Sequence, residues 1–443
     1  MMAQRSKTSR TIGCGAGFAG DRVDPAVALA ASGLVDAVAL ECLAERTLVP
    51  GLRARATDPN AGADPRLRRR LAPLLPAARA ENCRVISNLG AANPASAARQ
   101  IAALAGKVGC SGLRVAGLVG DDVMALRDRI DWNTPIQGRL LGAHAYLGCD
   151  GIVEAIAHGA DVVVTGRTAD SALFSAEVAP ILANHPDALA GATTVGHLLE
   201  CSGQITGGNF DFPEGAEFSA ADYADLGYPL ATVNPDGSAE IFLLDGKPGL
   251  VDVLTCTLQL LYEVHDPSAY ITPDVIIDFT GIVFEQVGPN RVRVGGARAR
   301  GRPERLKVSG FVDLPGFIAD MEIGYAGAGA LRRARVAAEV LRRRLGDIPD
   351  EDIRIDIVGV DSILGGASKV AAAPPSEARV HVSARCADAE MAEIVEDEVI
   401  ALTLSGPAGA GSIRGERRPR LDVVDGFIDR ALVSTELVWE RAS

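Results

Sequence analysis

One stretch near the start of the chain decides the fold: residues Thr11–Thr47 read TIGCGAGFAGDRVDPAVALAASGLVDAVALECLAERT. A short apolar strand passes into a glycine loop that ends at Asp21, and a helix then leads to a second apolar strand, Val35–Leu40. That strand runs directly into Glu41. Ligands of parallel α/β sheets bind at the carboxyl ends of the strands. The stretch therefore predicts two neighbouring strand ends that form the rim of an active site.

The alternation of strands and helices continues through the first half of the chain. Continuous apolar runs such as Cys83–Asn88, Gly112–Leu118 and Asp161–Thr165 are separated by helical stretches. Strands that are apolar on both faces are typical of a parallel sheet covered by helices. We therefore expect an α/β fold with a mostly parallel three-layer sheet in the N-terminal half. An incomplete barrel also fits, but the pattern offers fewer than eight convincing βα units.

The pattern changes near residue 210. From there, short strands are separated by hairpin turns such as NPDG at 234–237 and GPNRV at 288–292. We expect a flexible tail at residues 1–10, a parallel α/β domain at 11–210, and a second α+β domain with antiparallel strands at 211–443. The Gly/Arg-rich segment 408–420 is expected to be mobile.

Composition narrows the range of partners. The chain has 443 residues and a formal net charge of −13 at pH 7. This acidic balance disfavours nucleic acids and anionic membranes, because binding phosphates requires a basic surface. No apolar run reaches the roughly 18 residues of a membrane helix, and the N-terminus lacks the apolar core of a signal peptide.

Eight cysteines are scattered along the chain. None forms a CxxC pair, and no cysteine–histidine spacing matches a zinc site. Without a secretion signal, such cysteines are typical of reduced thiols in a cytoplasmic protein. We therefore expect a cytoplasmic protein without a bound metal.

The glycine loop invites comparison with a dinucleotide fingerprint. Gly15–Gly20 matches the spacing G-x-G-x-x-G, and Glu41 lies where an acidic residue would contact the ribose. Asp21 opposes this interpretation, because its charge would repel a pyrophosphate. Three interpretations stay open: a phosphate cradle for a nucleotide or CoA, the loop of a different active site, or a tight turn. The candidate cofactor-binding glycines are Gly13, Gly15, Gly17 and Gly20.

Five side chains are candidates for acid–base catalysis, because carboxylates and histidine most often transfer protons in enzymes. Each also has a structural alternative. The glutamates can balance a helix dipole, the histidine of GAHAYLG can be a core residue, and the aspartate of GRTAD can pair with the neighbouring arginine. The candidates are Asp21, Glu41, Glu45, His144 and Asp170.

A second group could bind the substrate. Arginine at a strand end suits a carboxylate or phosphate, as a bidentate donor. The two asparagines of NLGAANP fit a turn or a helix start equally well. A histidine four residues before a cysteine, in GHLLECSGQ, could also bind a metal or form a Cys–His pair if the segment is helical. The candidates are Arg46, Asn88, Asn93, Arg167, His197 and Gln204.

Several longer motifs occur together and in order between Thr11 and Gly366. They read IGCGAGFAGDRVDPA, ECLAERTL, NLGAANP, AYLG, GADVVVTGR, GHLLECSGQITGG, LLYEVHDPSAYITPDV and GVDSILG. In these motifs the chain resembles the acyclic terpene utilisation (AtuA) family. The resemblance implies a role in the catabolism of acyclic terpenes through acyl-CoA intermediates, with CoA entering as part of a substrate. It does not imply a particular reaction.

The chain departs from the family pattern in two places. His144 stands where the family usually has asparagine, and Gly166–Ser171 reads GRTADS where the family usually has GRVADP or GRVTDA. The resemblance also implies that longer relatives carry a C-terminal ferredoxin-like domain of about 100 residues, which a separate small ferredoxin-like subunit would supply here. A homo-oligomer that binds a small molecule is expected.

Carboxylates and arginines at strand ends, without a metal or nucleophile signature, favour a lyase or hydratase. In this hypothesis a carboxylate is the general base, and Arg167 holds the anionic group of the substrate. One alternative is a non-catalytic or ligand-binding subunit of a multi-protein complex. Another is a nucleotide-dependent enzyme.

Overall fold

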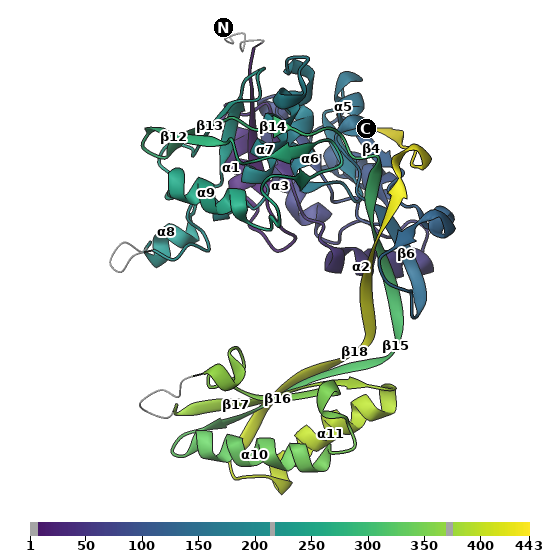
Figure 1. The fold of residues 1–443 in the computed structure, drawn as a ribbon, viewed down its shortest axis with the longest axis vertical. Helices are drawn as coiled ribbons and strands as arrows, with labels where there is room; N and C mark the ends of the chain where they lie inside the picture. Colours follow the sequence, from purple (N-terminus) through teal and green to yellow (C-terminus); the bar gives the residue numbers. More distant parts are fainter. Residues whose placement is uncertain (1–7, 213–217, 369–374) are drawn as a thin grey trace. The chain divides into compact units, whose positions relative to one another are not determined.

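Figure 1 shows the computed structural model of the chain, which describes residues 8–212, 218–368 and 375–443. The chain divides into two compact units. Unit 1 comprises Met1–Thr134, Leu141–Gly310 and Val424–Ser443, and unit 2 comprises Pro135–Leu140 and Phe311–Val423. This division differs from the boundary predicted near residue 211. Residues 1–7 of the predicted tail lie outside the described residues, and β1 already begins at Arg10.

The centre of the large sheet in unit 1 consists of five parallel strands, which lie in the order β1, β2, β3, β7, β4. Every residue of β2 and of β7 is buried. This explains their continuous apolar sequence, since central parallel strands are covered on both faces. The bounds are β1 Arg10–Ala16, β2 Ala37–Leu40, β3 Arg84–Ser87, β7 Val162–Thr165 and β4 Arg114–Val119.

Antiparallel strands extend this sheet on both sides. On one side β8, β9, β13 and β12 follow β1, and on the other β19 pairs with β4. Their bounds are β8 Leu230–Val233, β9 Ala239–Phe242, β13 Arg291–Gly295, β12 Val283–Gly288 and β19 Glu436–Arg441. The α/β class is thus confirmed as a mixed sheet, and strands that we expected in a second domain complete the first one.

Two apolar clusters pack against this sheet. Helices α1, α3 and α4 share one cluster with Val38 and Val85, whereas α5, α6 and α7 share the other with Ala39 and Ile86. Successive strand residues alternate between clusters because the pleat points them to opposite faces. The bounds are α1 Asp24–Ala31, α3 Leu67–Ala80, α4 Pro94–Lys107, α5 Asp150–Ala157, α6 Asp170–Val178 and α7 Pro186–Leu199.

Shorter elements complete unit 1, including a small sheet of β10, β11 and β14. The bounds are α2 Glu45–Thr57, α8 Ala220–Ala224, α9 Val253–Leu261, β5 Asp131–Trp132, β6 Arg139–Ala145, β10 Tyr270–Ile271, β11 Ile276–Asp278 and β14 Arg298–Ala299. Among the described residues, no helix combines the length and the apolar character needed to cross a bilayer.

Unit 2 is built on the element order β15, α10, β16, β17, α11 and β18. The bounds are β15 Arg305–Ala326, α10 Ala330–Arg344, β16 Ile353–Val358, β17 Glu377–Cys386, α11 Ala389–Ser405 and β18 Ala410–Asp429. The strands lie in the order β16, β17, β15, β18, and both helices lie on the same side of β16 and β17 (Figure 1). This βαββαβ arrangement is the ferredoxin-like topology.

The ferredoxin-like topology therefore occurs within this chain. Alternate residues of β17, such as Val380 and Val382, are buried with Leu341 of α10 and Val399 of α11. The prediction of a mobile segment at 408–420 is wrong, because most of that segment is the first half of β18. Its glycines and arginines do not prevent strand formation in an exposed strand that pairs with β15.

Candidate functional site

A cavity of about 700 Å³ lies at the carboxyl ends of β1, β2 and β7 in unit 1. Its walls come from the glycine loop, the residues after β2 and β7, and the turn that follows α7. The charged and tyrosine residues that line it are Asp21, Arg22, Glu41, Glu45, Tyr146, Arg167, Asp170, Glu200, Tyr223, Tyr228, Tyr262, Glu263 and Lys307. Sequences far apart in the chain thus converge on the edge that the opening stretch predicts.

Glu41 follows the last residue of β2 and is 7% exposed. Its Oε1 accepts hydrogen bonds from the backbone N–H of Leu43 at 2.8 Å and from Asn88 Nδ2 at 3.0 Å. Burial raises the pKa of Glu41 to about 7, although these two hydrogen bonds and the nearby Arg167 act to lower it. A carboxyl with this pKa can accept or donate a proton near neutral pH.

Asp170 begins α6, directly after the loop that follows β7. Burial raises the pKa of Asp170 well above its usual range, and the nearby Glu41 and Glu200 carboxyls add to this effect. Its Oδ1 is buried and has no hydrogen-bond donor. The raised pKa favours the protonated carboxyl, which is the form that can serve as an acid.

His197 and Glu200 form a buried pair at the end of α7. His197 Nδ1 lies 2.9 Å from Glu200 Oε1, and Nε2 lies 3.1 Å from the carbonyl oxygen of Leu260. Burial acts to lower the pKa of His197, but the Glu200 charge and both hydrogen bonds outweigh it, so the pKa is raised. Glu200 lines the large cavity, whereas His197 lines a smaller adjoining one.

Arg167 links the two sides of the cavity. Its guanidinium donates to the carbonyl of Leu43, to Glu45 Oε1 and to the hydroxyl of Tyr146, and it lies 4.2 Å from the centre of the Tyr146 ring. Its backbone N–H donates to Asp121 Oδ2 at 2.8 Å. Arg167 is 3% exposed, so its first effect is to fix Glu45 and Tyr146 at the cavity wall. Substrate binding by Arg167 stays a prediction.

Asp21 lines the cavity and also closes the glycine loop on itself. Its carboxylate accepts from the backbone N–H of Gly17 at 2.8 Å and of Arg22 at 2.9 Å, and from the hydroxyl of Tyr228. Buried Arg70 supports the same loop by donating to the carbonyls of residues 18, 19 and 21. The loop N–H groups that would bind a phosphate are therefore partly used by Asp21.

The four glycines have different surroundings. Gly13 and Gly15 belong to β1, where a side chain on Gly15 would meet Val38 at 2.6 Å. A side chain on Gly17 would meet the carbonyl oxygen of Glu200 at 2.6 Å, so glycine lets the loop approach the turn after α7. These contacts explain Gly15 and Gly17 by close packing, and cofactor binding by Gly13, Gly15, Gly17 and Gly20 stays a prediction.

The remaining candidates separate into cavity and non-cavity residues. Gln204 lines the cavity, and Asn88 supports it through Glu41 and the backbone N–H of Cys42. Asn93 instead caps α4, accepting from the N–H of Ser96 at 3.1 Å. His144 is not among the cavity residues, and its Nδ1 lies 2.8 Å from Asp121 Oδ2. The side chain of Arg46 lies outside the described residues.

Sequence reasoning missed the cavity roles of Tyr228, Glu263 and Lys307. Tyr228 precedes an antiparallel strand and has no local signal, whereas Glu263 belongs to the polar segment YEVHDP, which the sequence favours as a helix end. Cys201 also lines the cavity, but burial and the Glu200 charge raise its pKa to about 12. The thiol is therefore protonated at neutral pH and is a poor nucleophile.

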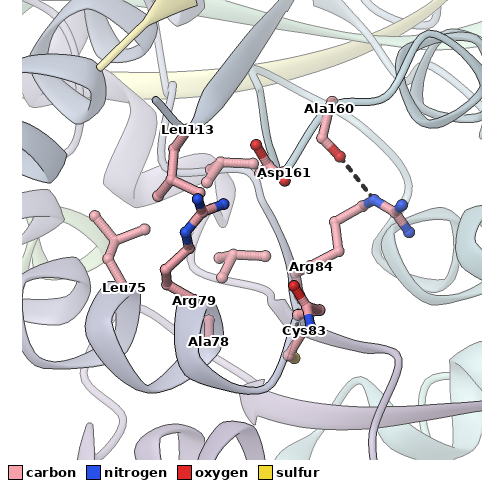
Figure 2. Close-up of a pocket in the computed structure, with 11 residues that line it drawn as sticks. Leu75, Ala78, Arg79, Cys83, Arg84, Leu113, Ala160 and Asp161 are labelled. Carbon is pink, nitrogen blue, oxygen red and sulfur yellow. Dashed lines mark hydrogen bonds between the residues drawn. The ribbon is translucent and has the colours of Figure 1, made fainter. Parts of the chain in front are cut away.

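A second, much smaller cavity of about 60 Å³ lies at the opposite, amino edge of the sheet (Figure 2). Arg79, Cys83, Arg84, Leu113 and Asp161 are among its walls. Arg84 Nε donates to the carbonyl of Ala160 at 2.9 Å, and its Nη1 donates to Glu177 Oε2. This cavity is too small for an organic substrate.

Among the described residues, Cys149, Asp150 and Asp274 are grouped closely enough to suggest metal ligands. Both Asp274 oxygens, however, accept from the backbone N–H of Cys149 at 3.0 Å, and Arg302 pairs with Asp150. Burial and the two aspartates raise the pKa of the Cys149 thiol well above its usual range. These partners explain the cluster without a metal.

The model of the family described as acyclic terpene utilisation family protein AtuA matches residues 10–439. The chain belongs to the AtuA family. The match includes both the cavity residues of unit 1 and the ferredoxin-like unit 2, so both are parts of the AtuA-family sequence. No curated protein and no solved structure matches this chain.

Proposed function

We propose that this AtuA-family protein is a lyase or hydratase that acts on a carboxylic acid or its CoA thioester. One observation carries the proposal: Glu41 and Asp170, two buried carboxyls with raised pKa values, line the same large cavity. Enzymes obtain acid–base groups for neutral pH by burying carboxyls and placing like charges near them. The pair therefore suits a reaction that removes one proton and donates another.

In the dehydration direction, ionised Glu41 removes a proton from the carbon next to the substrate carbonyl. Protonated Asp170 donates its proton to the departing hydroxyl, which leaves as water. The C–H and C–O bonds break, a C=C bond forms, and the proton taken by Glu41 returns to Asp170 through solvent. Hydration is the reverse. Arg167 and Lys307 line the same cavity and supply positive charge for the carboxylate or the developing enolate.

The two alternatives receive less support from the geometry. A ligand-binding subunit needs no pair of carboxyls with raised pKa values, and such pairs destabilise the fold. A nucleotide-dependent enzyme needs free backbone N–H groups for phosphate, whereas Asp21 occupies those of Gly17 and Arg22.

The test begins with a thermal-shift screen over acyl-CoAs, hydroxy acids and nucleotides, because a bound ligand stabilises the folded state. Exchange of the hydrogen next to the carbonyl for deuterium is then followed by NMR on each ligand found. Glu41→Gln should slow the exchange by roughly 10²–10⁴-fold, the usual contribution of a general base. The control Glu177→Gln removes a buried carboxyl of α6 that does not line the cavity, and should leave exchange unchanged. Full exchange in Glu41→Gln would refute the assignment.

A further inference from the structure

The wall that carries Asp170 also carries the buried pair His197 and Glu200. Asp170 and Glu200 both line the large cavity and a smaller adjoining cavity of about 220 Å³. His197 lines only the smaller one and is 1% exposed. The reaction proposed for Glu41 and Asp170 does not use His197 or Glu200. The proposed reaction therefore does not explain why this buried pair lies beside the reacting groups.

Both ring nitrogens of His197 face hydrogen-bond acceptors. Nδ1 lies 2.9 Å from a Glu200 carboxylate oxygen, and Nε2 lies 3.1 Å from the carbonyl oxygen of Leu260. Neutral imidazole has one N–H, whereas imidazolium has two. When Glu200 is ionised, only the imidazolium can donate to both acceptors, and the raised pKa of His197 agrees with that charged form.

The ring is also held in place. Gln259 Nε2 donates to the carbonyl oxygen of His197 at 3.1 Å, and the rings of Tyr270 and Phe279 lie 4.9 and 5.8 Å from the imidazole. The Tyr270 hydroxyl lies 3.3 Å from His197 Nδ1. With its position and both nitrogens fixed, His197 acts as a stationary positive charge beside Glu200.

Two carboxyl oxygens in this wall have no donor. Glu200 Oε2 and Asp170 Oδ1 are both buried, and neither accepts a hydrogen bond. Burying a carboxylate oxygen without a donor is costly. Neighbouring carboxyls in a dry site avoid this cost by keeping one of the two protonated.

The other charged groups near this pair have both signs. Glu41, Glu45 and Arg167 face Asp170, and Glu263 faces both His197 and Glu200. Arg167 already binds Glu45, and two further cations, Arg305 and Lys307, line the smaller cavity and pair with Asp131 and Asp425. Ionising Asp170 would add a negative charge beside the carboxyls of Glu41, Glu45 and Glu200.

We infer that His197 is a positioning residue: its imidazolium keeps Glu200 ionised, and ionised Glu200 keeps the proton on Asp170. The inference rests on the proposed function, because it names what maintains the acid of that site. In this role the pair His197–Glu200 acts through Asp170, although Glu200 also lines the large cavity. Without the histidine charge, Glu200 takes up a proton, and Asp170 then ionises at lower pH.

Infrared spectroscopy of the full chain tests this without a substrate, because protonated carboxyls have a C=O band that carboxylates lack. A titration from pH 5 to 9 should show this band for Asp170 at pH 7, identified by its loss in Asp170→Asn. In His197→Gln and in Glu200→Gln, the band should disappear at a pH lower by about one unit or more, the usual effect of removing a neighbouring like charge. Glu177→Gln is the matched control and should not move it.

Two outcomes would overturn the inference. One is an Asp170 that is already ionised at pH 7 in the unaltered protein, and the other is a band that titrates at the same pH in both variants. Binding of Mn²⁺ that is lost in Glu200→Gln would also count against it, because a cation would then take the place of the proton. Circular dichroism identifies variants that fail to fold, and two independent substitutions keep the test decisive. Failure of deuterium exchange in the unaltered protein would refute the proposed reaction while leaving these titrations interpretable.

Discussion

The two edges of the central sheet both carry buried charges but use them differently. At the amino edge, Arg84 donates to the Ala160 carbonyl (Figure 2) and also pairs with Glu177. At the carboxyl edge, Asp170 and Glu200 keep buried oxygens that have no donor. Paired charges stabilise a fold, whereas unpartnered ones cost stability and are typical of functional sites. Glu177 thus has an arginine partner, whereas Asp170 Oδ1 and Glu200 Oε2 are left without a donor beside a large cavity.

The largest expected effect is at the amino edge. Arg84→Ala removes the close partner of Glu177, which is 3% exposed, and should lower the free energy of unfolding by roughly 3–5 kcal/mol. Burial already raises the pKa of Glu177, so the loss should grow as pH rises through its folded pKa. Urea unfolding at pH 5 and pH 8 measures both quantities. An equal loss from Arg84→Lys would show that shape, not charge, is decisive.

At the carboxyl edge, Glu41→Gln should stabilise the protein. The pKa of Glu41 rises from 4.5 to about 7 on folding, so the folded state binds more protons between these values, and stability falls as pH rises through that window. At pH 8 this shift lowers the free energy of unfolding of the unaltered protein by roughly 3 kcal/mol. The variant avoids this loss because glutamine does not ionise. Unfolding curves from pH 4 to 8 should therefore be flatter for the variant. An unchanged slope would contradict the assigned pKa.

Asn88→Ala should have a smaller effect with a distinct signature. It removes the donor to Glu41 Oε1 and the acceptor for the N–H of Cys42, at a cost of roughly 1–3 kcal/mol. In the unaltered protein the hydrogen bond from Asn88 lowers the pKa of Glu41. Removing it should therefore raise that pKa further. The pH profile of deuterium exchange would move to higher pH. An unchanged pH profile would show that Asn88 does not influence the pKa of the group that removes the proton.

The smallest expected effect comes from Asn93→Ala, the matched asparagine outside the cavity. Loss of this helix cap should lower the free energy of unfolding by about 1 kcal/mol. The pH profile and the ligand-induced thermal shift should stay unchanged. A change in ligand binding would show that Asn93 reaches the site, contrary to its hydrogen bonds with Ser96 and Ala61.

Much of the cavity could be predicted because its residues follow strands. Glu41 comes after β2, and Arg167 and Asp170 come after β7, so local apolar pattern and strand direction bring them to one edge. His144 could not be placed in this way. It also follows an apolar run, but β6 lies outside the main sheet and turns it toward Asp121.

Local pattern could not assign roles either. Asn88 and Asn93 have the same side chain five residues apart, yet Asn88 supports Glu41 and Asn93 caps α4. Asp21 looks like a catalytic carboxylate in the sequence. In the structure it accepts hydrogen bonds from two backbone N–H groups of the loop and from the hydroxyl of Tyr228. These differences depend on contacts between distant segments, which one sequence does not encode as a local pattern.

The sequence by itself determined the α/β class, the family and the strand ends that bear Glu41 and Asp170, because apolar periodicity and strand direction are local properties. Only the tertiary structure decided that later antiparallel strands complete the first sheet, and that unit 2 is ferredoxin-like. It also brought Glu200 next to Asp170. Both outcomes depend on contacts between residues far apart in the sequence. Strand pairing across long separations completes the sheet, and the burial of a carboxyl by distant segments sets its pKa and thus its charge.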